Sequence, residues 1–197
     1  HIYAGFRSEA SLILPVSTLG RKYYSTNYYQ LSTGNSKSQF QIVATEANTV
    51  VQYQLRRNGF LDPLVQTQTL NNPGDVLQIQ DAADLTGSLI ESIASGTGGC
   101  KKIAVFSGSS SLAIGRSGCT PTSYDPLFQQ CYPVTSWGKN FGVVPPANNA
   151  NGYHMRVLAS EDNTLVDVNG TNVLLIYLDD LNDWVDYMKG EPGGGPP

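Results

Sequence analysis

Three cysteines and two histidines are the residues of this sequence with the most obvious chemistry: Cys100, Cys119, Cys131, His1 and His154. A structural zinc site needs cysteines or histidines in closely spaced pairs, and these residues are too dispersed to provide them. Three cysteines can instead form one disulfide and leave one thiol over. The cysteines therefore predict an oxidising compartment, not a metal centre.

Acidic residues offer a second possible site. Glu161, Asp162, Asn163 and Asp167 could ligate calcium, which prefers several oxygen ligands. A plain turn between strands explains the same residues without an ion. No nucleophile elbow, phosphate loop or dinucleotide fingerprint occurs, and His154 is more simply a histidine within a strand than a member of a catalytic triad. Neither an enzyme nor a cofactor is expected, with calcium the open alternative.

The composition favours an extracellular setting. Of the 197 residues only 14% are charged, against about 25% in an average soluble domain, and the polar surface must come from Ser, Thr, Asn, Gln and Tyr. A net charge of −4 argues against a nucleic-acid partner. No run approaches about 18 apolar residues, so no membrane span is expected. Asn169 opens an N-glycosylation sequon, which chance could also produce in such a chain. The abrupt start at His1 suggests a mature or excised segment of something longer.

The elements that must position these residues are strands. The segments 40–44 and 49–55 alternate apolar and polar residues and flank a turn at 46–48, which predicts a β-hairpin. The segments 102–106 and 112–114 are predicted to form another hairpin, with Gly108 and the following serines as its turn. Many short strands separated by Gly and Pro predict an all-β, sandwich-like body of antiparallel strands.

Two blocks of the sequence recur. Residues 45–49 (TEANT) return 115 residues later as 160–164 (SEDNT), and residues 15–21 (PVSTLGR) return 118 residues later as 133–139 (PVTSWGK). The same order and nearly the same spacing predict two duplicated halves with a join near residue 100. We expect one β domain over residues 1–178 in which each half covers the apolar face of the other.

The C-terminal region differs from this body. Leu181, Trp184, Val185 and Met188 follow helical i, i+3, i+4, i+7 spacing, so the acidic and apolar segment 179–189 is interpreted as a short helix that buries these side chains. Residues 190–197 are rich in Gly and Pro and are interpreted as a linker-like tail.

Aromatic residues provide a possible recognition surface. The pairs Tyr23–Tyr24 and Tyr28–Tyr29 could present rigid amphipathic rings to a ligand. The preferred interpretation is alternate burial, with one tyrosine of each pair in the core. Trp137 replaces Leu19 in the repeated block, which points to a core position and not to a sugar-binding platform.

The hairpin predicted around Gly108 suggests how the cysteines pair. It brings the chain after Gly115 back to the side where Cys100 enters, so a Cys100–Cys119 disulfide is expected, with Cys131 as a free thiol or a partner for another chain. The alternative is a Cys119–Cys131 disulfide, which would leave Cys100 free.

Several blocks, taken together, resemble the N-terminal domain of the IgGFc-binding protein family. They are ASLILP (10–15), LGRKYY (19–24), FQIVATE (40–46), DLTGS (84–88), CKKIAVFSG (100–108), DPLFQQ (125–130), PVTSWGK (133–139) and RVLASEDNT (156–164). The resemblance covers roughly residues 2–172 and is closer to the invertebrate and bacterial versions. In related sequences an apolar residue often occupies the position of Cys131, which agrees with a small buried thiol.

The resemblance implies an extracellular, non-enzymatic module of a secreted matrix, mucus or cell-surface protein, with a structural or adhesive role. Its partners would be extracellular or surface macromolecules or further copies of itself, so oligomers are possible. The alternative function is a lectin-like carbohydrate-binding module that uses exposed Tyr or Trp. After Thr171 the sequence departs from the family pattern, because an acidic segment replaces an expected strand pair.

Overall fold

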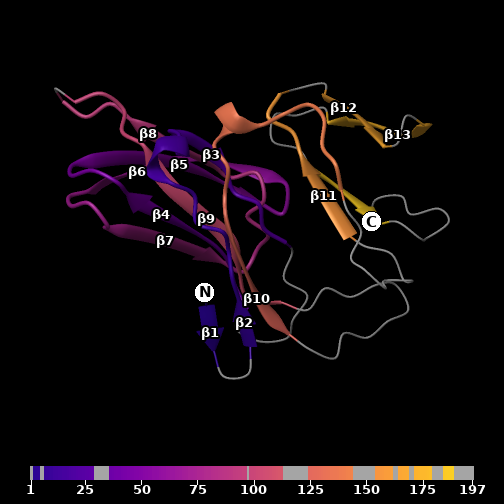
Figure 1. Cartoon of the computed structure of the whole chain (residues 1–197), viewed down its shortest axis with the longest axis horizontal. Coiled ribbons are helices and arrows are strands. Elements are labelled where there is room, and N and C mark those ends of the chain that lie inside the picture. Colours follow the sequence, from indigo (N-terminus) through magenta and orange to yellow (C-terminus); the bar gives the residue numbers. More distant parts are fainter. Residues whose placement is uncertain are drawn as a thin grey trace. The chain divides into compact units, whose positions relative to one another are not determined.

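A computed structural model describes residues 2–4, 7–28, 36–96, 98–112, 124–143, 154–161, 164–168, 171–178 and 184–188. The chain forms two compact units, His1–Trp137 and Gly138–Pro197 (Figure 1). Every described element is a β-strand except two single 3-10 turns, η1 (Val16–Thr18) and η2 (Val134–Ser136). The predicted all-β, sandwich-like class is therefore confirmed. The join predicted near residue 100 is the boundary between the two sequence repeats. It differs from the boundary between the compact units, which lies between Trp137 and Gly138.

Two four-stranded antiparallel sheets make up most of the first unit (Figure 1). One sheet has the order β3 (Lys22–Tyr24), β8 (Leu89–Ile93), β5 (Thr49–Arg57), β6 (Phe60–Leu70). The other has the order β10 (Asp125–Gln130), β9 (Ile103–Leu112), β4 (Ser38–Ala44), β7 (Val76–Asp81). A short hairpin of β1 (Ile2–Ala4) and β2 (Arg7–Glu9) precedes them.

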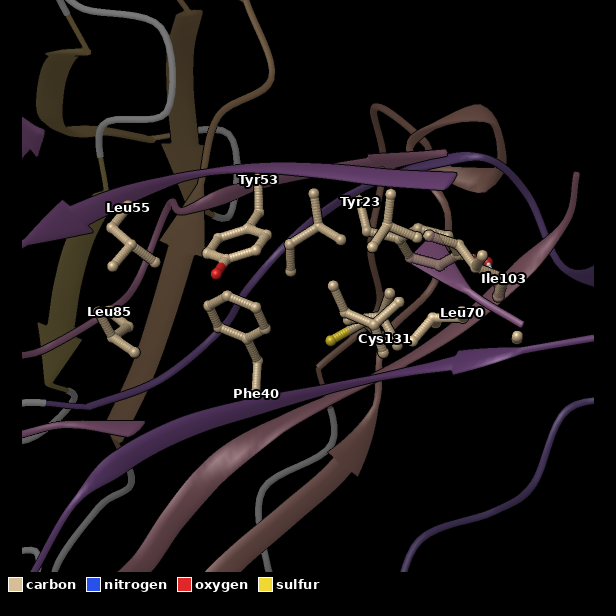
Figure 2. Close-up of a cluster of buried hydrophobic side chains, with 13 residues drawn as sticks. Tyr23, Phe40, Tyr53, Leu55, Leu70, Leu85, Ile103 and Cys131 are labelled. Carbon is tan, nitrogen blue, oxygen red and sulfur yellow. Dashed lines mark hydrogen bonds between the residues drawn. The ribbon is translucent and has the colours of Figure 1, made fainter. Parts of the chain in front are cut away.

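The core lies between these two sheets. Phe40 and Ile42 on β4 and Val51 and Tyr53 on β5 are buried on the inner faces of their strands. Figure 2 shows the rings of Phe40 and Tyr53 meeting from opposite sheets, with centroids 6.0 Å apart in an edge-to-face arrangement. The alternation of apolar and polar residues thus identified the buried faces of both strands correctly.

The predicted hairpin of residues 40–44 and 49–55 is wrong. β4 pairs with β7 and β9, and β5 pairs with β6 and β8, so the turn at 46–48 joins two different sheets. A strand with one apolar face can bury that face equally well as a neighbour in one sheet or across the gap between two sheets. Alternation therefore predicts the buried face of a strand but not its partner.

The second predicted hairpin, around Gly108, is also wrong. β9 continues through Gly108 and the serines that follow it, and it pairs with β4 on one side and β10 on the other. Neighbouring groups satisfy the polar atoms of this stretch: the Asn27 amide donates to the Gly108 carbonyl at 2.6 Å, and the Ser110 N–H donates to the Lys37 carbonyl at 2.9 Å. Partners on both sides thus hold a strand in a segment whose composition indicated a turn.

The second unit contains four described strands in two antiparallel pairs. β11 (His154–Leu158) pairs with β14 (Trp184–Met188), and β12 (Thr164–Val168) pairs with β13 (Thr171–Leu178). The expected C-terminal helix is corrected, because residues 184–188 form a strand, and pairing with β11 overrides a helical spacing that rested on only four residues. Residues 179–183 and the tail lie outside the described residues.

Candidate interaction surface

The hairpin of β5 and β6 has a turn that its sequence dictates. Asn58 and Gly59 have φ values of 49° and 85°, and Asn-Gly with both φ values positive is the preferred pair for a two-residue turn that matches strand twist. The Asn58 N–H donates to the Asp84 carbonyl, and the Asn58 side-chain oxygen accepts from the Asp84 N–H, both at 2.8 Å. The end of the hairpin is therefore attached to the loop that precedes β8.

That loop, residues 84–88, is buried and contains a network of hydrogen-bonded polar groups. The carboxylate of Asp84 accepts from the N–H of Thr86 at 2.9 Å and from its hydroxyl at 2.6 Å. The hydroxyl of Ser88 donates to the Leu85 carbonyl at 2.8 Å and accepts from the Arg56 N–H at 2.9 Å. Because buried polar groups are costly unless they are hydrogen-bonded, this network fixes the position of the hairpin.

An ion-pair network ties the hairpin to the other sheet. The Arg57 guanidinium binds Asp81 on β7 at 2.7 Å and also contacts Asp62 on β6. Burial alone would raise the pKa of Asp81, but hydrogen bonds from the Ala83 N–H and from Arg57 outweigh it and lower that pKa. The Leu64 N–H and then Arg57 lower the pKa of Asp62. Both carboxylates are thus held in their charged form beside Arg57.

Apolar side chains face solvent along β6. Phe60 is 79% exposed and Leu64 is 59% exposed, and Leu61 and Val65 are also exposed. From Leu64 to Leu70 the strand carries no charged residue. β6 pairs with β5, and among the described strands none pairs with its other side. We call these four apolar residues, with the open side of β6, the β6 edge surface, which offers both hydrogen-bonding groups and apolar area to a partner.

The two described cysteines, Cys100 and Cys131, are not part of the β6 edge surface. Cys131 is a buried free thiol in the core of the first unit, with its Sγ 3.0 Å from the Ser107 hydroxyl (Figure 2). Its burial raises the pKa of the thiol. Cys100 is half-buried and also a free thiol in the structure.

Cys119 lies outside the described residues, so its pairing stays a prediction. The hairpin that motivated the Cys100–Cys119 pairing is not formed. Cys100 precedes β9, and the far end of that strand is about 30 Å away at about 3.3 Å per residue.

The candidate ion and glycan sites fall mostly on residues that are not described. Asp162, Asn163 and Asn169 lie outside the described residues, whereas Glu161 and Asp167 are exposed. The Glu161 carbonyl accepts from the Thr164 hydroxyl at 2.7 Å, which is ordinary turn geometry. In the described part of the chain no group of three or more His, Cys, Asp or Glu could hold a metal ion. The calcium and glycosylation hypotheses therefore stay predictions.

The described tyrosines of the two predicted pairs provide no exposed ring surface. Tyr23, Tyr24 and Tyr28 are all buried, and Tyr29 lies outside the described residues, so the expected alternate burial is wrong for the first pair. The Tyr23 hydroxyl donates to the Ile103 carbonyl at 2.7 Å and accepts from the Gly20 N–H at 2.8 Å. Tyr24 is buried as well, and its ring packs on Trp137, just after η2, at 5.8 Å.

Sequence reasoning missed β6 altogether. The signal was present, because Asn58-Gly59 is the strongest short hairpin motif and β-branched and apolar residues follow it. Pro63 obscured the pattern, although proline is tolerated in edge strands such as this one.

These observations define a class: an all-β sandwich domain with an open, apolar edge strand. The chain belongs to the IgGFc-binding family, because the family model described as IgGFc binding protein matches residues 9–192, nearly the whole sequence. No curated protein and no solved structure matches the chain. Across the described residues there is no helix with the length and apolar character needed to cross a membrane.

Proposed function

We propose that this chain is an extracellular, non-enzymatic interaction module with a structural or adhesive role, which binds protein partners through the β6 edge surface. One observation carries the proposal: Phe60 and Leu64 face solvent on a strand whose outer side is unpaired in the described part of the chain. An exposed apolar edge is costly in water and prone to unwanted pairing, so its presence is best explained by a partner.

Membership of the family supports the kind of partner. The printed name of the family is that of a protein that binds the Fc part of IgG, which is an extracellular protein. The low charge of the sequence agrees with a secreted or surface location. Matrix or mucus proteins and further copies of the chain are the other partners that the proposal includes.

Binding measurements with edge variants test this proposal. The immobilised chain is exposed to purified IgG Fc and to purified mucin, and Leu64→Lys and Phe60→Ser are compared with wild type. Thr69→Lys is the matched control, because Thr69 is exposed on the same strand outside the apolar group. We expect saturable binding to at least one probe, weakened at least tenfold by both edge variants and unchanged by the control. Equal binding by all variants, or no binding to either probe, would contradict the proposal.

The tyrosine pairs that suggested a recognition surface do not support the lectin-like alternative. Tyr23, Tyr24 and Tyr28 are buried, so their rings are not free to stack on a sugar, whereas Trp137 is half-buried against Tyr24 and Tyr132 is 52% exposed. A glycan array tests the alternative directly: saturable binding of a defined glycan that survives Leu64→Lys would replace the β6 edge surface as the functional site.

A further inference from the structure

The two units share an order of strand pairing. In the first unit β5 and β6 form a hairpin, and β4 and β7, which flank it in the sequence, pair with each other. In the second unit β12 and β13 form a hairpin, and β11 and β14, which flank it, pair with each other. The chain passes from β4 to β5 in a different sheet, and it likewise passes from β11 to β12 in a different sheet.

Equivalent positions lie 115 residues apart in these segments. The Thr49 hydroxyl donates to the Glu46 carbonyl at 2.7 Å, and the Thr164 hydroxyl donates to the Glu161 carbonyl at 2.7 Å. The 3-10 turns η1 and η2 lie 118 residues apart, and the φ and ψ values before them are −66° and 150° at Pro15 and −64° and 148° at Pro133. The recurring sequence blocks thus adopt matching local structures.

The correspondence extends to the core residues but not to how deeply they are buried. Ile42 and Val51 belong to the main core and are fully buried. The positions 115 residues later are Val157 and Val166, which are only half-buried and pack around Ala159. The second unit therefore has the same core positions with less apolar surface covered.

The difference is explained by β8 and β9. In the first unit β8 pairs with β5 and β9 pairs with β4, which brings Ile90, Ile103 and Val105 into the core. In the second unit the described strands leave the corresponding edges of β12 and β11 without a neighbour. Both open edges border the apolar face on which Val157 and Val166 lie.

We infer that the second unit is a strand acceptor: it binds an antiparallel pair of β-strands with the pattern of β8 and β9, supplied by a partner protein. One strand would extend β11 and the other would extend β12. The pattern required is short, alternating and apolar on its inner side, as Ile90 and Val105 are in the first unit. Main-chain hydrogen bonds along the two edges would supply affinity, and the apolar inner side chains would supply specificity.

A second copy of the chain fits these edges less well. If β11 paired with its own copy around a two-fold axis centred on the strand, Arg156 would lie opposite Arg156, because it is the middle residue of β11. Like charges directly opposite each other destabilise an antiparallel pair. In the first unit the position equivalent to Arg156 is Gln41, and β9 places Phe106 opposite it.

Hydrogen exchange on the intact 197-residue chain tests this inference. The probe is a synthetic peptide with the sequence of residues 88–112, which contains β8 and β9, with Cys100→Ser to prevent disulfides. We expect saturable binding that slows amide exchange at least tenfold in β11 and β12. A peptide carrying Ile90→Pro and Val105→Pro should have no effect, because proline removes main-chain donors and disrupts the strands.

Variants of the chain provide the reciprocal test. Val157→Asp should abolish peptide binding, whereas the matched control Asp167→Ser, at an exposed position of β12, should leave it unchanged. Unaltered exchange in β11 and β12 with the native peptide would overturn the inference even if Val157→Asp fails to fold. Protection of these strands without peptide, together with a dimer in sedimentation, would overturn it in favour of a second copy. Leu64→Lys leaves this site intact, so the outcome is distinguishable from failure of the β6 edge surface.

Discussion

Replacing Gly108 with alanine should separate β10 from the first unit. A Cβ at this position would lie far inside van der Waals distance of the Leu127 carbonyl and close to the Phe128 nitrogen, both backbone atoms of β10. Backbone atoms cannot rotate away as a side chain can. The strands would have to move apart by about 1 Å, which takes their N–H···O contacts out of hydrogen-bonding range.

The size of the effect follows from the contacts that would be lost. Phe128 is opposite Gly108 in the ladder, and two further pairs flank it, so two or three hydrogen bonds at about 1 kcal/mol each would be lost. The rings of Phe106 and Phe128 are stacked with centroids 5.0 Å apart, and their separation would cost about 1 kcal/mol more. We therefore expect Gly108→Ala to lower the free energy of unfolding by about 3 kcal/mol.

Urea denaturation with hydrogen exchange measures this effect. Gly99→Ala is the matched control, because a Cβ there meets no atom within 4 Å. We expect amide exchange to accelerate in β10 and its partner segment of β9 in Gly108→Ala and to stay unchanged in Gly99→Ala. A stability within about 1 kcal/mol of the control, with β10 still protected, would refute the reasoning.

Three further predictions concern the core, the ion pairs and the thiols. Phe40→Ala should destabilise the first unit by about 3–5 kcal/mol in urea denaturation, whereas Met155→Ala at the equivalent, half-buried position should cost about 1 kcal/mol; equal losses would contradict the difference in burial. Because the pKa values of Asp62 and Asp81 are lowered on folding, the stability that they contribute is present above about pH 4 and is lost as the pH falls further. Asp81→Asn should reduce this acid dependence. An unchanged pH profile of the urea midpoint would show that the network contributes nothing. Cys131 should resist maleimide labelling until the protein is unfolded, because its thiol is buried. Non-reducing peptide mapping tests the predicted Cys100–Cys119 disulfide. A Cys119–Cys131 peptide would show that both thiol predictions are wrong.

The sequence predicted which residues are buried better than which strands pair. The alternation in residues 40–44 and 49–55 correctly placed Phe40 and Val51 inside, yet the two strands belong to different sheets. Side-chain period is a local property of a strand, whereas its partner depends on residues far away in the chain. β4, for example, pairs with strands that begin at Val76 and Ile103. Long-range pairing of this kind leaves no short sequence pattern to read.

The candidate surface was hidden for a different reason. β6 carries an exposed apolar group and a proline, and both features run against the usual pattern of a strand with one buried face. Phe60 and Leu64 also carry no catalytic or metal-ligating group, so their residue types alone do not mark a site. Such a surface becomes visible only when neighbouring strands show which side of the strand is open.

The residues that identify the family and those of the proposed β6 edge surface are different. The block at 84–88 supplies the buried network of Asp84 and Thr86, and the block at 40–46 supplies the core position of Phe40. Phe60 and Leu64 lie in none of the blocks on which the resemblance rests. Blocks of this kind hold the sandwich and its hairpin in place, so substitutions on the open side of β6 should leave the fold intact. Family membership therefore predicts the scaffold of this chain more directly than it predicts the ligand, and the Leu64→Lys comparison tests the ligand-binding side independently.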